Sequence, residues 1–401
     1  MRFLHTGDWH VGKMLKGRNR LDEQAAVLAE IVDIARRERV DALLVGGDSF
    51  DGFSPKAEDE RLVYTMLAEC CGAGIPVVVI GGNHDHPRRL VALRELLDPL
   101  KIYVRAEPCR PDAGGVIRLP SRDGREVAQI AVLPFVQEPR IVDACRLFDS
   151  EEQWYQAYAD RVAQMMEALA TWFRADTVNI LMAHVFMDGG LAGGGERTLH
   201  IGQVYAVSPQ RLPASAHYVA LNHLHRPQRV PAPAWAEYSG SPLQLDFGEV
   251  DQAKRVVLVE ARAGRAVEVH NIPLTSGRKL LDVQGTLDEL QARAESLRGA
   301  YLRVTLNVPA PAPGLANRVK EILPDALEVR LQYPRLEQPT VTGTSEDSAA
   351  EPGTDGAPAA SSADPVQRLQ AYYRREHGAE LPPALAELFT RLYEEVVHET
   401  A

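Results

Sequence analysis

Short apolar runs alternate with helical patterns through the first 250 residues, and this alternation limits the fold more than any other feature. The runs lie at residues 2–5, 42–45, 76–80, 127–132, 179–182 and 218–221. Apolar side chains at helical spacing predict helices at residues 22–39, 57–70, 90–97 and 151–173. Strand and helix in alternation predict an α/β domain whose strands are largely parallel, at least in its first half.

A second, smaller domain follows. Two β-rich runs at residues 254–260 and 265–272, around Gly264, predict a hairpin that closes the first domain. A strand, helix, strand, helix, strand pattern then occupies residues 279–332. We therefore expect a main domain at residues 1–276 and a small α/β domain at residues 277–336.

The last part of the chain changes in composition. Residues 337–364 are rich in Pro, Gly, Ser, Thr, Ala and acidic residues, which predicts a disordered linker. Residues 365–401 then show two helical apolar stripes, separated by Gly378 and Pro382. These helices either fold back on the body of the protein or bind a groove on a partner, and the long linker favours a partner. The residues expected to bind it are Leu369, Tyr372, Tyr373, Leu385, Leu388, Phe389, Leu392 and Val396.

Composition excludes some classes of protein and leaves others open. The formal net charge of −11 argues against a nucleic-acid partner, but residues 337–364 hold six acidic residues and no Lys or Arg. No apolar run approaches the roughly 18 residues that a membrane helix needs, and the N-terminus is not a signal peptide. The four cysteines lack C-x-x-C spacing, which favours reduced, buried thiols in a cytoplasmic protein.

Polar side chains able to bind metal follow five of the predicted strands. They are Asp8 and His10, then Asp48 and Asp51, then Asn83, His84 and Asp85, then His184, and last His223 and His225. Ligands bind at the carboxyl ends of strands in open α/β sheets, so we expect all five segments to meet at one edge.

The chemistry of these side chains suits two divalent cations. Carboxylate, amide and imidazole groups are ligands for hard or borderline ions, and one carboxylate can bridge a pair of them. Such a pair can hold a phosphate, activate water and stabilise a leaving oxygen. Glycines before Asp48 and Asn83 allow the backbone to turn sharply off the strand. Each motif is weak alone, whereas five in order, each at a strand end, are specific.

The order of these motifs along the chain resembles that of the calcineurin-like metallophosphoesterases. The motifs are D-x-H, G-D, G-N-H-D, a later His and H-x-H. Within that superfamily, the stretches at residues 4–10, 47–51, 196–197, 218–221 and 238–243 look like the nuclease subunits of bacterial DNA repair complexes. The resemblance implies an α/β core built as an α+β sandwich, a small α/β capping domain and C-terminal helices.

The resemblance also implies roles for individual residues. One metal would be held by Asp8, His10, Asp48 and His225, and the other by Asp48, Asn83, His184 and His223. His84 would orient the phosphate and help to protonate the leaving oxygen, with Asp51 as its partner. The expected cofactor is two Mn²⁺ ions, with Mg²⁺ as the alternative. One departure is Asn222, where the family usually has Gly, and Asn tolerates a positive φ best among the other residues.

Basic residues near these motifs are candidates for contacts with a phosphate backbone, although a solvated surface is the competing interpretation. They are Lys13, Lys16, Arg18, Arg20, Arg88, Arg89 and Arg226. The family suggests a partner, an ABC-type ATPase with a long coiled coil, and a homodimer within a heterotetramer that acts on DNA near the nucleoid. No G-x-x-x-x-G-K-[ST] loop is present, so any ATP dependence must come from that partner.

Three functions compete at this point. The first is a metal-dependent DNA nuclease, with 3′–5′ exonuclease activity on duplexes and endonuclease activity on single strands and hairpins. The second is a phosphatase or phosphodiesterase for small molecules or phosphoproteins on the same two-metal core. The third is a scaffold without catalysis. The basic cluster, capping domain and tail helices favour the nuclease, and the complete set of ligands argues against a scaffold.

Overall fold

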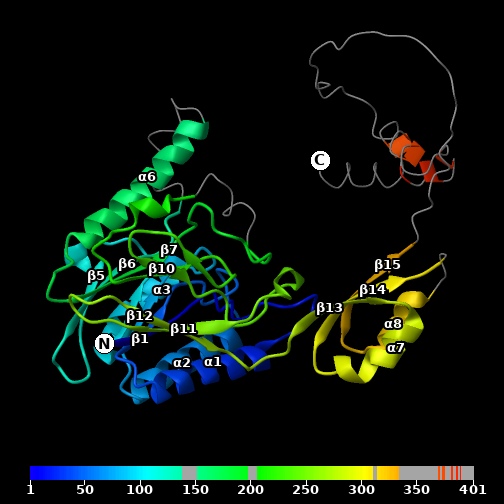
Figure 1. Cartoon of the computed structure of the whole chain (residues 1–401), viewed down its shortest axis with the longest axis horizontal. Coiled ribbons are helices and arrows are strands. Elements are labelled where there is room, and N and C mark those ends of the chain that lie inside the picture. The colour runs from blue at the N-terminus through cyan, green and yellow to red at the C-terminus, as the bar shows by residue number, and fades with distance from the viewer. Residues whose placement is uncertain are drawn as a thin grey trace, which may run out of the picture. The chain divides into compact units, whose positions relative to one another are not determined.

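The computed structural model describes residues 1–137, 151–196, 206–309 and 314–333, together with a few positions between 369 and 389. The chain divides into two units, residues 1–335 and residues 336–401. The first unit contains three sheets with helices packed on them (Figure 1). The candidate site lies on the first two sheets.

The first sheet has six strands in the order β12-β11-β1-β2-β3-β4. The central strands β1 (Arg2–Thr6), β2 (Ala42–Val45), β3 (Val77–Ile80) and β4 (Ile102–Arg105) are parallel. The hairpin of β11 (Arg255–Glu260) and β12 (Glu268–Pro273) joins the edge through β1, antiparallel to it. The predicted closing hairpin and the parallel first half are thus confirmed.

The second sheet also has six strands, in the order β5-β6-β7-β8-β10-β9. Its strands are β5 (Val116–Pro120), β6 (Val127–Leu133), β7 (Val178–His184), β8 (Tyr218–Asn222), β9 (Gln228–Val230) and β10 (Trp235–Tyr238). Four of them, β6, β7, β8 and β10, are parallel, and β5 and β9 close the two edges antiparallel.

The central strands of both sheets are buried on both faces, which explains why they are continuous apolar runs. In β2, Leu43 and Val45 face one core, where α1 (Leu21–Arg37) and α2 (Ala57–Gly72) cover the first sheet. Ala42 and Leu44 face the other core, between the two sheets. Helix α6 (Glu151–Ala170) covers the outer face of the second sheet (Figure 1). The expected α/β sandwich is confirmed.

The third sheet belongs to the segment predicted as a capping domain. Strands β13 (Leu280–Gly285), β14 (Tyr301–Asn307) and β15 (Ala326–Gln332) are parallel, and α7 (Leu287–Arg293) and α8 (Leu315–Ile322) connect them. These elements share a hydrophobic core of their own. Thr286 and Glu289 form a capping box that begins α7. This separate core supports the domain boundary, which stays a prediction.

Some elements differ from expectation. The helix predicted at residues 90–97 is two short helices, α3 (Pro87–Ala92) and α4 (Arg94–Leu97), followed by a 3₁₀ turn. Strands β4, β5, β9 and β10 were not predicted, because each contains a charged residue that interrupts or ends its short apolar pattern.

The C-terminal unit is described at few positions. Leu369, Tyr373, Leu385 and Phe389 are helical, as the apolar stripes predict. The linker at residues 337–364 and the side chains of Tyr372, Leu388, Leu392 and Val396 lie outside the described residues. Among the residues that the structure describes, no helix has both the length and the apolar character needed to cross a membrane.

The cysteines allow a chemical test of burial in α2. Cys70 is fully buried, and burial raises the pKa of its thiol to about 12. Cys71 and Cys109 are half-buried free thiols, so the prediction of burial is correct for Cys70 only among these three.

We expect iodoacetamide at pH 8 to modify Cys71 and Cys109 of the native protein at least about tenfold faster than Cys70, because the thiolate is the nucleophile. Peptide mass spectrometry measures the rates, and labelling in denaturant is the control. Equal rates for Cys70 and Cys71 in the native protein would contradict the packing of α2.

Candidate metal centre

The carboxyl ends of strands from both sheets carry the seven predicted metal ligands. From the first sheet, Asp8 and His10 follow β1, Asp48 follows β2 and Asn83 follows β3. From the second sheet, His184 is the last residue of β7, and His223 and His225 follow β8. All seven are buried. The structure therefore brings the five segments together, although at the joint edge of two sheets instead of at one sheet.

The backbone φ angle is positive at four of these residues, a conformation that residues other than Gly rarely adopt. The φ angles are 49° at Asp8, 45° at His10, 49° at Asp48 and 113° at His223. Hydrogen bonds hold this backbone: the Asp8 N–H donates to the Gly47 carbonyl at 2.9 Å, and the His10 N–H donates to the Asp48 carbonyl at 2.9 Å. Conformations of this kind cost about 1–3 kcal/mol each and cluster at functional sites.

Two imidazoles and Asp48 meet in the first half of the centre. The Nε2 atoms of His10 and His225 face each other at 3.1 Å, and His10 Nε2 lies 3.6 Å from Asp48 Oδ2. Burial lowers the pKa of His10 to about 4, so its ring is neutral and has a lone pair to offer. Two ring nitrogens at this distance need a proton or a cation between them.

The second half repeats this arrangement. Asn83 Oδ1 lies 3.0 Å from His184 Nε2 and 2.9 Å from His223 Nδ1. Those two ring nitrogens are 3.3 Å apart, and His184 Nε2 is 3.5 Å from Asp48 Oδ2. His184 Nδ1 lies 2.8 Å from the Gly46 carbonyl oxygen, to which it donates, so Nε2 is the ring nitrogen that faces the cluster.

This donor set fits divalent metal ions. It combines carboxylate, amide and imidazole side chains. In two sets of three residues, His10–Asp48–His84 and Asp8–Asp48–His184, the potential ligand atoms lie within 4.8 Å of one another. Asp48 belongs to both groups and lies between the two halves. The charge of Asp48 raises the pKa of His184 to about 9, although burial alone would lower it. The cluster thus attracts a positive charge.

Comparison with known proteins agrees with this geometry. Residues 1–208 match the family model for calcineurin-like phosphoesterases, and residues 276–377 match a model described as "Type 5 capsule protein repressor C-terminal domain". The SbcD subunit of the nuclease SbcCD from Bacillus subtilis is 38% identical over 70% of this chain and 71% of its own length. The chain belongs to the SbcD family of calcineurin-like phosphoesterases. It is therefore a metal-dependent phosphoesterase of a nuclease family.

Further relatives carry the same name. The SbcD subunit from Rhodobacter capsulatus is 34% identical over 88% of this chain and 90% of its own length, and that from Escherichia coli K12 is 30% identical over 74% of each. Among solved structures, a Thermus thermophilus protein aligns with 67% of this chain and 98% of its own, at a TM-score of 0.38 and 15% identity. A dimetal phosphatase from Danio rerio aligns with 69% of this chain and 99% of its own, at a TM-score of 0.36 and 12% identity.

The predicted pair of His84 and Asp51 is present in this SbcD family member, but in another form. His84 Nδ1 lies 2.7 Å from the backbone carbonyl of Asp51, which accepts its proton. The Asp51 carboxylate instead lies 3.3 Å from His10 Nδ1 and 3.5 Å from Lys13 Nζ. The carboxylate of Asp51 therefore supports a predicted ligand, and its main chain orients His84. The backbone N–H of His84 also donates to Asp48 Oδ1 at 2.7 Å.

Several supporting residues were not predicted. Glu249 is fully buried, and its carboxylate lies 3.0 Å from His225 Nδ1 and 2.8 Å from Lys254 Nζ. Although burial opposes its ionisation, Lys254 and His225 lower the pKa of Glu249 to about 2. Asp85 accepts backbone N–H bonds from Ser49, Phe50 and Gly82. Glu249 lies outside the α-helices and strands, so no periodicity in the sequence links it to His225. Asp85, by contrast, is part of the G-N-H-D motif, which is a sequence signal for it.

Five of the seven predicted DNA contacts interact with other side chains of the protein, among them Lys13, which lies 3.5 Å from the Asp51 carboxylate. Arg20 is only 4% exposed, bonds Glu23 and the Gln244 carbonyl, and stacks 5.6 Å from Tyr301. It is a structural residue of the junction with the third sheet, contrary to the prediction. Lys16 pairs with Glu328 of that sheet, Arg18 lies over Tyr301, and Arg89 pairs with Glu60. Arg88 and Arg226 are exposed.

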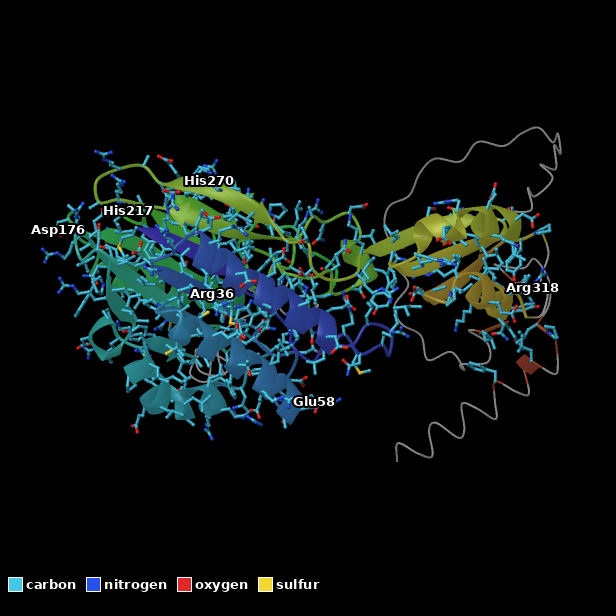
Figure 2. All side chains as sticks on the ribbon, turned by 90° about the horizontal axis from the view of Figure 1, so that it is seen from below. Arg36, Glu58, Asp176, His217, His270 and Arg318 are labelled. Atoms are coloured by element: carbon cyan, nitrogen blue, oxygen red, sulfur yellow. The ribbon has the colours of Figure 1, made fainter. Side chains whose placement is uncertain are left out.

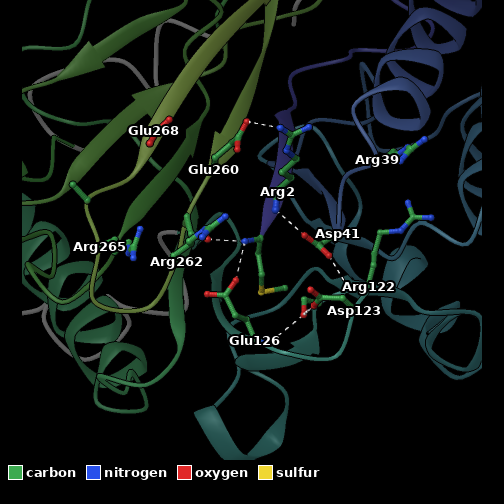
Figure 3. Close-up of a pocket in the computed structure, with 14 residues that line it drawn as sticks. Arg2, Arg39, Asp41, Arg122, Asp123, Glu126, Glu260, Arg262, Arg265 and Glu268 are labelled. Carbon is green, nitrogen blue, oxygen red and sulfur yellow. Dashed lines mark hydrogen bonds and ion pairs between the residues drawn. The ribbon is translucent and has the colours of Figure 1, made fainter.

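Other polar groups lie away from the centre. A polar cavity of about 580 Å³ opens where β1 and β2 begin, at the strand ends opposite the ligands. Arginine and acidic side chains line it, and they pair with one another, as Arg2 does with Glu260 at 3.0 Å (Figure 3). His270 is exposed on β12, and His217 is half-buried and accepts a hydrogen bond from the Asn179 N–H at 3.1 Å (Figure 2). Neither feature adds to the metal centre.

The contact between Glu249 and His225 predicts a role in metal affinity. Replacing Glu249 with Gln removes the charge that orients the ring, so we expect about 10–100-fold weaker binding of a divalent ion. Calorimetric titration of the metal-free protein with Mn²⁺ measures it. Glu260→Gln, at the opposite strand ends, is the control. Equal affinities for Glu249→Gln and wild type would remove Glu249 from the centre.

Proposed function

We propose that this chain is a two-metal nuclease that hydrolyses phosphodiester bonds of DNA as one subunit of an SbcCD-type complex. The convergence of Asp8, His10, Asp48, Asn83 and three further histidines on one buried point carries the proposal. The names of the relatives, each the SbcD subunit of a nuclease SbcCD, support it.

The first metal would be held by Asp8, His10, Asp48 and His225, and the second by Asp48, Asn83, His184 and His223. Asp48 would contribute to both sites, because its Oδ2 lies 3.6 Å from His10 Nε2 and 3.5 Å from His184 Nε2. Two Mn²⁺ ions are the proposed cofactor, since mixed oxygen and nitrogen ligands suit manganese better than magnesium. When bound, they supply an activated water and neutralise charge on the phosphate.

His84 would serve as the general acid. The Asp51 carbonyl accepts a hydrogen bond from His84 Nδ1–H at 2.7 Å and fixes the ring, so Nε2 is the atom that would carry the transferable proton when the imidazole is in its protonated form. As water attacks phosphorus and the bond to the leaving oxygen breaks, that proton passes from Nε2 to the leaving oxygen. The ring centroids of His84 and His10 are 4.5 Å apart, which places the acid directly beside the proposed metal ligands.

DNA and an SbcC-like ABC-type ATPase are the proposed partners, in a heterotetramer with two copies of this chain. Lys13, Arg88 and Arg226, which are close in sequence to the proposed site residues, remain candidates for contacts with the DNA backbone. The proposed activities are 3′–5′ exonuclease on duplexes and endonuclease on single strands and hairpins. No observation favours the small-molecule phosphatase, which would share the metal centre but would not need the third sheet or the C-terminal helices.

The first test is cleavage of single-stranded and hairpin DNA with Mn²⁺. We expect cleavage by the wild type, none after EDTA treatment, and about 10²–10⁴-fold slower cleavage by His84→Ala, because a general acid contributes that much. His270→Ala, at an exposed position of β12, is the control.

Gel analysis of end-labelled DNA measures the rates. If bis-nitrophenyl phosphate is hydrolysed in the presence of Mn²⁺ while DNA stays intact, with and without the SbcC-like partner, the metal centre holds and the DNA substrate is wrong.

A second test concerns the partner. We expect deletion of residues 365–401, or Phe389→Glu, to abolish capture by the coiled-coil base of an SbcC-like ATPase, because a charge in an apolar stripe opposes docking. Hydrolysis of bis-nitrophenyl phosphate should not change, which shows that the metal centre is intact. Quantitative pull-down measures capture, and Arg374→Glu is the control. Undiminished capture by the truncated chain would reject the proposed surface.

A further inference from the structure

Asn222 is the position where this chain departs from the usual Gly of its family, and it lies deep in the structure. It is the last residue of β8 and is fully buried. Its own φ is not positive, so the tolerance of Asn for positive φ is not its role; the positive φ belongs to the next residue, His223. The reason for an amide at this position must therefore lie in its contacts.

The Asn222 side chain uses both its donors and its acceptor. Its Nδ2 donates to Asp8 Oδ2 at 3.0 Å and to Ser239 Oγ at 2.9 Å. Its Oδ1 accepts from His5 Nε2 at 2.8 Å. Because the amide is fully paired, its rotamer is fixed, and replacing it would leave buried polar groups without partners.

The chain of hydrogen bonds continues behind Asn222. His5 must donate through Nε2, so its Nδ1 accepts from the Tyr218 hydroxyl at 2.9 Å. Burial lowers the pKa of His5 to about 4, which keeps the ring neutral. Tyr218, His5 and Asn222 thus form a directed series that ends on the Asp8 carboxylate.

Asp8 is held from one side by two consecutive residues. The His223 N–H lies 3.1 Å from Asp8 Oδ1 and 3.3 Å from Oδ2, and the Asn222 amide bonds Oδ2. The carboxylate from the first sheet is therefore oriented by the end of β8 in the second sheet. Loss of the amide would remove one of these contacts and leave the orientation of the Asp8 carboxylate to the His223 N–H alone on this side.

Two glycines make room for this amide. A Cβ atom at Gly7 would lie 2.4 Å from Asn222 Nδ2, and one at Gly46 would lie 1.7 Å from Asn222 Oδ1. Neither glycine has a positive φ, so space and not conformation requires them. Asn222, Gly7 and Gly46 come from three different strand ends and depend on one another.

We infer that Asn222 is a positioning residue for Asp8, and that it forms one coupled unit with Gly7 and Gly46. The inference rests on the proposed ligand role of Asp8. If this inference is correct, residue 222 can be substituted without loss of metal binding only when the residues that border it are substituted as well.

A double-mutant cycle tests this unit. We expect Asn222→Gly to fold and to bind Mn²⁺ about tenfold more weakly, because Asp8 loses one of its fixed contacts. Gly46→Ala alone should lower the melting temperature and weaken Mn²⁺ binding more, because its Cβ collides with a buried amide. The combination Asn222→Gly with Gly46→Ala should bind Mn²⁺ no more weakly than Asn222→Gly, because the new methyl fills the vacated space.

Calorimetric titration measures Mn²⁺ affinity, and thermal unfolding of the metal-free variants measures stability. Asn179→Gly is the matched control, since Asn179 is a buried, hydrogen-bonded Asn at the opposite end of β7. It should lower stability and leave Mn²⁺ affinity unchanged.

Two results would overturn the inference. One is unchanged Mn²⁺ affinity in Asn222→Gly, and the other is a double variant whose losses equal the product of the two single losses. Failure of the proposed function is a different result, because the wild type would then bind no Mn²⁺ or cleave no DNA. The thermal unfolding cycle reports on the coupling of the three positions in either case.

Discussion

The position of the Asp48 carboxylate, buried between His10 and His184, is the constraint on which the rest of the centre depends. Its Oδ2 lies within 3.6 Å of a ring nitrogen on each side. Although burial opposes its ionisation, the neighbouring histidines hold the pKa of Asp48 well below its usual range. Gly82 allows this position, because a Cβ there would lie 2.1 Å from Asp48 Oδ1. Any movement that displaces the Asp48 carboxylate would disrupt both halves of the candidate metal centre.

The sandwich architecture explains why this contact can be formed. Asp48 follows a strand of the first sheet and His184 ends a strand of the second, so their separation depends on the spacing of the sheets. The apolar layer between the sheets, which includes Leu44, Val78 and Ile180, sets that spacing. Close-packed interiors resist changes of volume, so substitutions in this layer should alter metal geometry from a distance. The core is in this sense part of the site.

Much of this could be predicted from the sequence, because buried strands are read as continuous apolar runs and ligands follow them directly. The proposed metal ligands could be predicted from only their order along the chain and their positions directly after each apolar run. The division into two sheets could not be predicted from the runs, since parallel strands look alike in either sheet. Arg20 was misassigned because nearness in sequence to Asp8 and His10 says nothing of the Tyr301 ring packed against it. Contacts such as His225 with Glu249 join residues that no periodicity connects.

The metal-free cluster carries an electrostatic cost that connects folding with function. Burial raises the pKa values of Asp8 and Asp85 to about 6, and the charge of Asp48 adds to both shifts. Groups that resist ionisation in this way gain from a cation that binds the folded chain only, and that binding is also folding free energy. The strained turns at Asp8 and Asp48 persist because the surrounding hydrogen bonds fix them. A bound cation would therefore favour the burial of charged Asp8, one of the residues proposed to hold the metal.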